Sequence, residues 1–216
     1  MDIKEVNEDT INKIVNRVWE KIKDDVEKKG YIMSSEKTLV FKFMWELAKD
    51  INNDNKLKFD FEYIAYDKLD GTDKYLDLLF WTDEKYKIAI EFKFPKKIEE
   101  GGSDTAIVRR NTYKDISRLK YLVDNKINEI NIGYFICLTN QSTYFNKDAK
   151  LKKYKDLVTY NNYKYEKSTI LNYDDIKELP DKVEFNWDNI DEKGSNIIER
   201  GKFAWLKPIK IIKLEE

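Results

Sequence analysis

Three side chains suited to phosphodiester hydrolysis lie within one short stretch of the sequence: Asp77, Glu91 and Lys93. The stretch 75–95 predicts two strands joined by a polar turn at 82–85, because strand-forming residues are dense on both sides of that turn. Two carboxylates can hold a hard divalent cation such as Mg²⁺, and a neighbouring lysine can offset negative charge that develops at phosphorus. The residue types therefore predict a metal-dependent phosphodiesterase site.

The register of this hairpin decides whether the two acids meet. A turn centred on Glu84 makes one face of the hairpin wholly apolar: Leu76 meets Phe92, Leu78 meets Ile90, and Phe80 meets Ile88. On the opposite face Asp77 then meets Glu91, with Lys93 alongside. A shift of one residue in either strand would destroy both patterns at once, so the apolar face predicts the meeting of the acids.

Two carboxylates directly opposite each other in a ladder repel, unless a cation lies between them. A structural interpretation stays open beside the catalytic one, in which the acids are surface residues of an edge hairpin paired with Lys93 and Lys87. Acid-x-Lys triplets also occur elsewhere in this charged chain, but only the triplet at Glu91 ends an apolar strand.

Asp77, a 13-residue gap and then Glu91-Phe92-Lys93 resemble the motif of the PD-(D/E)xK nuclease superfamily, although Leu76 stands in place of the proline. The resemblance implies an α/β fold with a restriction-endonuclease-like core, a mixed sheet flanked by helices in the order α-β-β-β-α-β. It also implies that Asp77 and Glu91 bind Mg²⁺ or Mn²⁺, with help from the backbone carbonyl of Phe92.

Periodicity places the elements of that core within residues 34–139. The expected elements are a helix at 34–52 capped by Ser34 or Ser35, a strand at 58–66, the hairpin, a helix at 104–127 and a strand at 129–139. Outside the core we expect a helix at 8–29, a short helix near 148–157, and strands at 183–187 and 202–214. We therefore expect a single domain, residues 1–216, with a C-terminal α/β extension at 140–216.

Two of these elements carry apolar patterns that predict their buried sides. Apolar and polar residues alternate in the first strand, which predicts that the strand is half-exposed. Its apolar side consists of Phe59, Phe61, Tyr63 and Ala65. Helical spacing gives the helix at 104–127 its core stripe: Ile107, Ile116, Leu119, Val123 and Ile127.

Glu36 opens the helix at 34–52 and shares a side with its apolar residues. One interpretation is an acid of the first turn, which the helix dipole favours. The other follows from the resemblance, because many family members carry a glutamate on this helix that is directed at the metal. Both interpretations stay open for Glu36, and the second would make it part of the catalytic set.

The helix at 104–127 holds three of the five arginines of the chain. Guanidinium groups bind phosphate in bidentate geometry, so this helix is a candidate nucleic-acid surface. The candidate contacts are Arg110, Tyr113, Lys114 and Arg118. The alternative is an ordinary solvated helix face.

Composition narrows the classes of function. The chain has no histidine, which excludes Ser-His-Asp triads and histidine-ligated zinc, and its single cysteine, Cys137, fits a reducing cytoplasm. No apolar run reaches membrane-spanning length, so no membrane association is expected. The net charge of −1 restricts any nucleic-acid surface to a local patch.

The sequence therefore predicts a Mg²⁺- or Mn²⁺-dependent nuclease acting on DNA, with RNA as the other candidate substrate. Double-strand cutters need two sites, so a homodimer is expected by family analogy alone. The alternative function is an inactive module with the nuclease fold that binds nucleic acid or a protein partner.

Overall fold

A computed structural model of the chain describes residues 7–51, 57–66, 69, 74–81, 86–96, 105–149, 153–167, 173–190 and 202–213. The helices are α1 (Glu8–Lys29), α2 (Glu36–Asp50) and α3 (Thr105–Asp124), with short 3₁₀ turns η1 (Ile127–Glu129) and η2 (Ser142–Tyr144). The strands are β1 (Lys58–Ile64), β2 (Tyr75–Trp81), β3 (Lys87–Lys93), β4 (Ile130–Thr139), β5 (Tyr163–Glu166), β6 (Lys182–Phe185), β7 (Trp187–Asp188), β8 (Ala204–Leu206) and β9 (Ile209–Ile212).

Seven of these strands form one mixed sheet in the order β1-β2-β3-β4-β8-β7, in which β9 also pairs with β4. Strands β3 and β4 run parallel and the other neighbours run antiparallel. Since α3 connects β3 to β4, this parallel pair has the crossover helix that such pairs need. The fold is therefore mixed α/β, and α2-β1-β2-β3-α3-β4 follow one another in the expected order.

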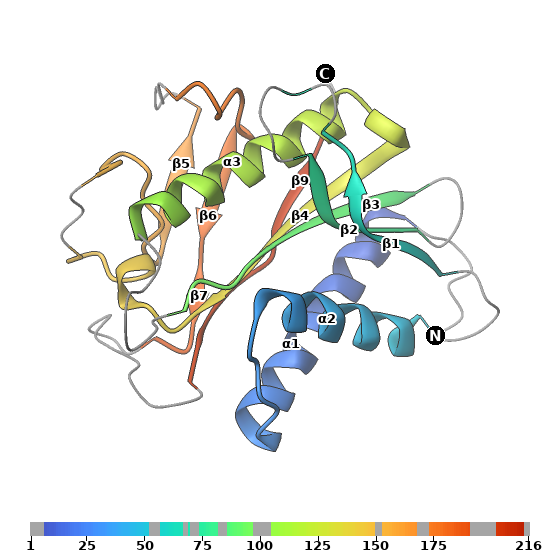
Figure 1. Cartoon of the computed structure of the whole chain (residues 1–216), viewed down its shortest axis with the longest axis horizontal. Helices are drawn as coiled ribbons and strands as arrows, with labels where there is room; N and C mark the ends of the chain where they lie inside the picture. The colour runs from blue at the N-terminus through green and yellow to red at the C-terminus, as the bar shows by residue number, and fades with distance from the viewer. Residues whose placement is uncertain are drawn as a thin grey trace.

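Helices cover both faces of the sheet (Figure 1). One apolar core lies between the sheet and α1 and α2, where Trp19 Nε1 donates to the carbonyl of Leu206 at 2.8 Å. The other core lies under α3 and includes the two-stranded sheet of β5 and β6. The C-terminal strands belong to the same packing, because β9 lies against β4 and contributes Ile211 to the α3 core. None of the described helices has the length and apolar character needed to cross a membrane.

The predicted hairpin register is confirmed where the β2–β3 ladder is regular. Pairs run from Trp81 opposite Lys87 to Leu78 opposite Ile90, while the turn at 82–85 lies outside the described residues. The prediction for Leu76 is wrong: its side chain lies in the α3 core, whereas Leu78 lies in the α1–α2 core. The two residues separate because the strand pairing becomes irregular between them, at Asp77.

Three other sequence expectations are wrong. Phe59 and Phe61 of β1 are exposed, because β1 is an edge strand and α2 leaves that part of its surface uncovered. Ile107 is 49% exposed instead of joining the core stripe of α3. The described residues near 148–157 form turns instead of a helix, since the Asn146 side chain accepts from the backbone N–H of Asp148 and Tyr154 has φ 49°.

Candidate functional site

The backbone around Asp77 is irregular on both sides of its strand. The β1–β2 register pairs Phe61 with Leu78 and Tyr63 with Leu76 but omits the pair between them, and Glu62 there has φ 50°. On the other side the carboxylate of Asp77 accepts from the backbone N–H of Phe92, with Oδ2 at 2.7 Å. A side chain therefore replaces the backbone ladder at this point, and the hydrogen bond fixes the Asp77 carboxylate beside β3.

Glu91 lies in the interior, with 2% of its surface exposed. Tyr66 donates its hydroxyl to Glu91 Oε1 at 2.7 Å, and Arg118 Nη2 lies 3.9 Å from the same oxygen. The Arg118 guanidinium also stacks on the Tyr66 ring at 3.7 Å from the ring centroid. These contacts orient the Glu91 carboxylate from one side and place a positive charge near it.

The Asp77 and Glu91 carboxyl groups interact electrostatically. Burial, the Asp115 carboxylate and the Asp77 carboxylate together raise the pKa of Glu91 well above its ordinary value. Burial also raises the pKa of Asp77, while Lys93 and the backbone N–H of Phe92 act to lower it. The Asp77 carboxylate is therefore among the charges that disfavour ionisation of Glu91.

Lys93 completes the group on the same strand. Its Nζ lies 2.7 Å from Asp115 Oδ2 and donates to the backbone carbonyl of Phe92 at 3.1 Å. Burial alone would lower the pKa of Lys93, but the surrounding carboxylates, above all Asp115, raise it. Lys93 is therefore a cation at neutral pH, and Asp115 holds its position.

Glu36 belongs to the same group through the first turn of α2. Ser35 caps this helix by accepting from the backbone N–H of Thr38 at 3.1 Å, which fixes where the helix begins. Glu36 Oε2 accepts from the backbone N–H of Phe94 at 2.9 Å, just beyond the end of β3. Burial and the carboxylate of Asp77 raise the pKa of Glu36, while Lys93 acts to lower it. The structure thus brings all four predicted catalytic residues to one place.

The residues predicted to bind nucleic acid do not form one surface. Tyr113 is fully buried and donates its hydroxyl to the carbonyl of Val158, so a surface contact from its ring is excluded in this conformation. Arg118 is 5% exposed and belongs to the carboxylate group described above. Both side chains are buried because α3 turns this side toward the sheet. Arg110 binds Asp175 at 2.9 Å, and Lys114 is half-buried.

Sequence reasoning missed two polar residues of the site, Asp115 and Tyr66. Asp115 lies four positions before Leu119 and seven before Leu122, on the side of α3 that faces the core. An acid within a buried helical stripe is a detectable signal, because an isolated charge is costly in the interior unless it is paired. Tyr66 follows β1 directly and carries no comparable signal, since a buried tyrosine is common.

The donor set fits a hard divalent cation with two carboxylates and a backbone carbonyl. Among the described residues, no three histidine, cysteine, aspartate or glutamate side chains are arranged to hold a metal ion. The hydrogen bonds described above engage Asp77 Oδ2 and Glu91 Oε1. Asp77, Glu91 and the Phe92 carbonyl are the residues that would hold Mg²⁺ or Mn²⁺, and water supplies the remaining ligands that Mg²⁺ usually keeps.

None of the family models, curated proteins and solved structures compared with this chain matches it.

Proposed function

We propose that this protein is a Mg²⁺- or Mn²⁺-dependent nuclease of the PD-(D/E)xK type, with a restriction-endonuclease-like core and with DNA as its substrate. The observation that carries the proposal is the meeting of the half-buried Asp77 carboxyl with the buried Glu91 carboxyl, with the Lys93 ammonium beside them. Carboxyl groups whose ionisation is disfavoured by burial and by each other are what a site built for a cation would hold when no metal is bound. The order of the elements from α2 to β4 supports the same assignment.

Each residue has a distinct task in this proposal. A bound cation supplies Lewis acidity and lowers the pKa of a coordinated water. Lys93 stays protonated, so it acts as a cation that stabilises negative charge at the phosphate and does not act as a general base. Asp115 positions Lys93, and Tyr66 positions Glu91. Glu36 adds a further carboxylate at the end of β3, where it can orient water.

The test combines cleavage with metal binding. Purified protein is incubated with plasmid DNA in Mg²⁺, in Mn²⁺ and in EDTA, and its melting temperature is measured in the same buffers. We expect cleavage and a rise in melting temperature with metal, because a ligand that binds the folded state stabilises it. Asp77→Asn and Glu91→Gln should abolish the metal-dependent rise, and Lys93→Met should lower the cleavage rate by roughly 10²-fold or more.

Lys87→Met is the matched control for Lys93→Met. Lys87 lies at the opposite end of β3 and pairs with the exposed Glu129 at 2.8 Å, so its loss should change neither cleavage nor metal binding. Protein that shows neither a metal-dependent rise nor cleavage would contradict the proposal. It would favour the inactive nucleic-acid or protein-binding module.

A further inference from the structure

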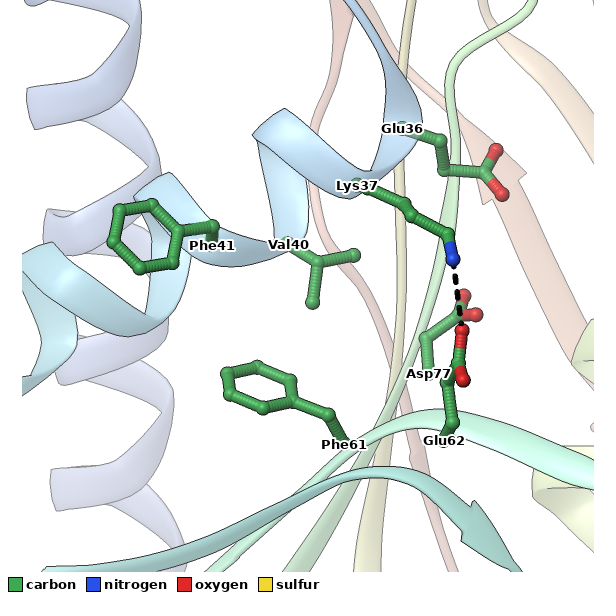
Figure 2. A pocket seen from close by; sticks show the side chains of 7 residues that line it. All are labelled: Glu36, Lys37, Val40, Phe41, Phe61, Glu62 and Asp77. Carbon is green, nitrogen blue, oxygen red and sulfur yellow. Dashed lines mark ion pairs between the residues drawn. The ribbon is translucent and has the colours of Figure 1, made fainter.

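A cavity of about 330 Å³ lies between α2, β1 and β2, and the carboxyl groups of Glu36 and Asp77 are part of its lining. Glu36 and Asp77 lie at one end, and Val40, Phe41 and Phe61 lie at the other (Figure 2). Its volume is at the lower limit of small-molecule pockets, which span about 300–1,000 Å³. Because Asp77 lines both the cavity and the carboxyl pair, a ligand in the cavity is in reach of the proposed catalytic centre.

The apolar end of the cavity continues into a surface of exposed aromatic rings. Phe41 is 61% exposed and stacks on Trp45, one helical turn away, with ring centroids 6.3 Å apart. Across the cavity Phe61 contacts Phe59 edge to face at 5.3 Å. Single exposed apolar residues are ordinary, whereas a contiguous exposed apolar patch is typical of binding sites.

An ion pair joins α2 to β1 at the cavity (Figure 2). Lys37 Nζ lies 3.2 Å from Glu62 Oε1, and both side chains are largely exposed. Such a pair contributes little to stability, so a ligand phosphate can replace Glu62 as the partner of Lys37 at small cost. Glu62 has φ 50°, a conformation that disfavours non-glycine residues and that recurs at functional sites.

The divalent cation of the proposed function would offset these carboxylates, so that a phosphate fits there beside Lys37 and a flat apolar ring fits at Phe41 and Phe61. A nucleotide has this construction, with a phosphate at one end and a base at the other. Within an intact duplex the base is stacked and paired, so its face is not available to a side chain. Aromatic platforms beside cationic groups are the usual means of binding unpaired bases.

We infer that the cavity binds an unpaired base adjacent to the phosphate at Asp77 and Glu91. The substrate class of the proposed nuclease is then a single strand, or a single-stranded end or flap, and an intact duplex is a poorer substrate. This inference rests on the proposed function for the position of the phosphate, whereas the base site can be tested separately by binding.

The binding experiment uses the full chain carrying Lys93→Met, which limits cleavage, in Mg²⁺ with a short fluorescein-labelled DNA oligonucleotide, either single-stranded or annealed to its complement. Fluorescence anisotropy should show tighter binding of the single strand. Phe41→Ala and Phe61→Ala should each weaken single-strand binding by about 10-fold, since stacking of one base on an aromatic side chain is typically of that size. Ile107→Ala, at an exposed apolar residue on α3, is the matched control and should leave binding unchanged.

The outcomes separate this inference from the proposed function. Metal-dependent cleavage with equal affinity for single strand and duplex, unchanged in Phe41→Ala, would overturn the base site and leave the nuclease standing. Ring-dependent single-strand binding without any metal-dependent melting shift would support the base site and contradict the nuclease. Concentration-dependent dimers of the wild type that Phe41→Ala dissociates would assign the rings to a second copy of the chain and overturn the inference.

Discussion

Two groups of charged side chains, each with buried members, differ in the balance of positive and negative charge. Between α1 and α2, Asp25 and Glu46 are surrounded by the ammonium groups of Lys21, Lys29, Lys42 and Lys49. At the end of β3, the carboxyl groups of Glu36, Asp77, Glu91 and Asp115 are met by two cations, Lys93 and Arg118. The first group has a surplus of cations and the second has a deficit.

The pKa values of the carboxyl groups follow this balance. Hydrogen bonds from Lys29 and Lys42 lower the pKa of Asp25 to about 2. Burial acts to raise the pKa of Glu46, yet hydrogen bonds from Lys21 and Lys42 lower it to about 2. In the second group burial and neighbouring carboxylates raise the pKa of Glu91 instead. Burial acts on the carboxyl groups of both sets, but at Glu46 the surrounding lysines outweigh it, whereas at Glu91 they do not. The second set lacks compensating positive charge, and a divalent cation would supply it.

The largest expected effect concerns the group between α1 and α2. Lys42 Nζ binds Asp25 at 2.6 Å and Glu46 at 2.9 Å, and its removal leaves buried carboxylates short of their central partner. We expect Lys42→Met to lower the free energy of unfolding by about 3–5 kcal/mol, the usual effect of breaking a buried pair. Urea denaturation measures this change.

Lys49→Met is the control for that measurement. Lys49 binds the same Glu46 at 3.2 Å, but its side chain is half exposed. Its removal should lower the free energy of unfolding by less than about 1 kcal/mol, as for other exposed pairs. Equal losses of unfolding free energy in Lys42→Met and Lys49→Met would show that the burial of the lysine is unimportant. The contrast in charge balance between the two groups of side chains would then have no energetic consequence.

The second prediction concerns the proton that Glu91 retains to higher pH because its pKa is raised. If a cation replaces that proton, metal binding must release it, and Mg²⁺ affinity should rise about tenfold per pH unit until the proton is lost. Isothermal titration calorimetry in buffers of different ionisation enthalpy measures the number of protons released. Glu129→Gln, at an exposed acid of η1, should leave this dependence unchanged. Affinity that is independent of pH would mean that no proton is displaced by the metal.

The hairpin shows how much of this site could be predicted from the sequence. Strict alternation of apolar residues fixes the register from Leu78 to Trp81, because a one-residue shift would expose the whole face. The alternation fails at Leu76, where a hydrogen bond from the Phe92 backbone to Asp77 replaces the ladder. Such a bend depends on tertiary contacts that no local pattern encodes.

Partners from distant elements were harder to predict than the motif itself. Asp115 meets Lys93 only after α3 has packed on the sheet, and Tyr66 meets Glu91 only after β1 has paired with β2. The burial of Tyr113 also depends on how α3 packs on the sheet. Helical periodicity predicts which side of α3 is buried but not how wide the buried side is. Residue types and spacing thus predicted which carboxylates and which lysine lie together, and packing determined which residues support them.

The third prediction uses opposite pH dependence in the two groups. A raised pKa in the folded state means that the stabilising contribution of Glu91 is present below its ordinary value and is lost as the pH rises. In EDTA at pH of about 8, Glu91→Gln should therefore be more stable than the wild type by on the order of 1 kcal/mol, and the gain should shrink toward pH of about 4.

Glu46→Gln should show the reverse. The lowered pKa of Glu46 means that its contribution is present above its ordinary value and is lost as the pH falls toward about 2. Glu46→Gln should be less stable than the wild type at neutral pH, and the difference in stability should shrink as the pH falls. Urea denaturation across this pH range checks both slopes, and slopes of the same sign in the two variants would contradict the contrast between the groups.

The smallest expected effect on stability is at Lys37, whose ion pair with Glu62 is exposed, unlike the pairs in either buried group. Lys37→Met should change the free energy of unfolding by less than about 0.5 kcal/mol. If Lys37 contacts a phosphate of a bound single strand, its removal should reduce the slope of log affinity against log salt by about 0.7. Anisotropy titrations at several salt concentrations measure that slope. An unchanged slope would place the phosphate away from Lys37, so that the rings alone would account for binding at the cavity.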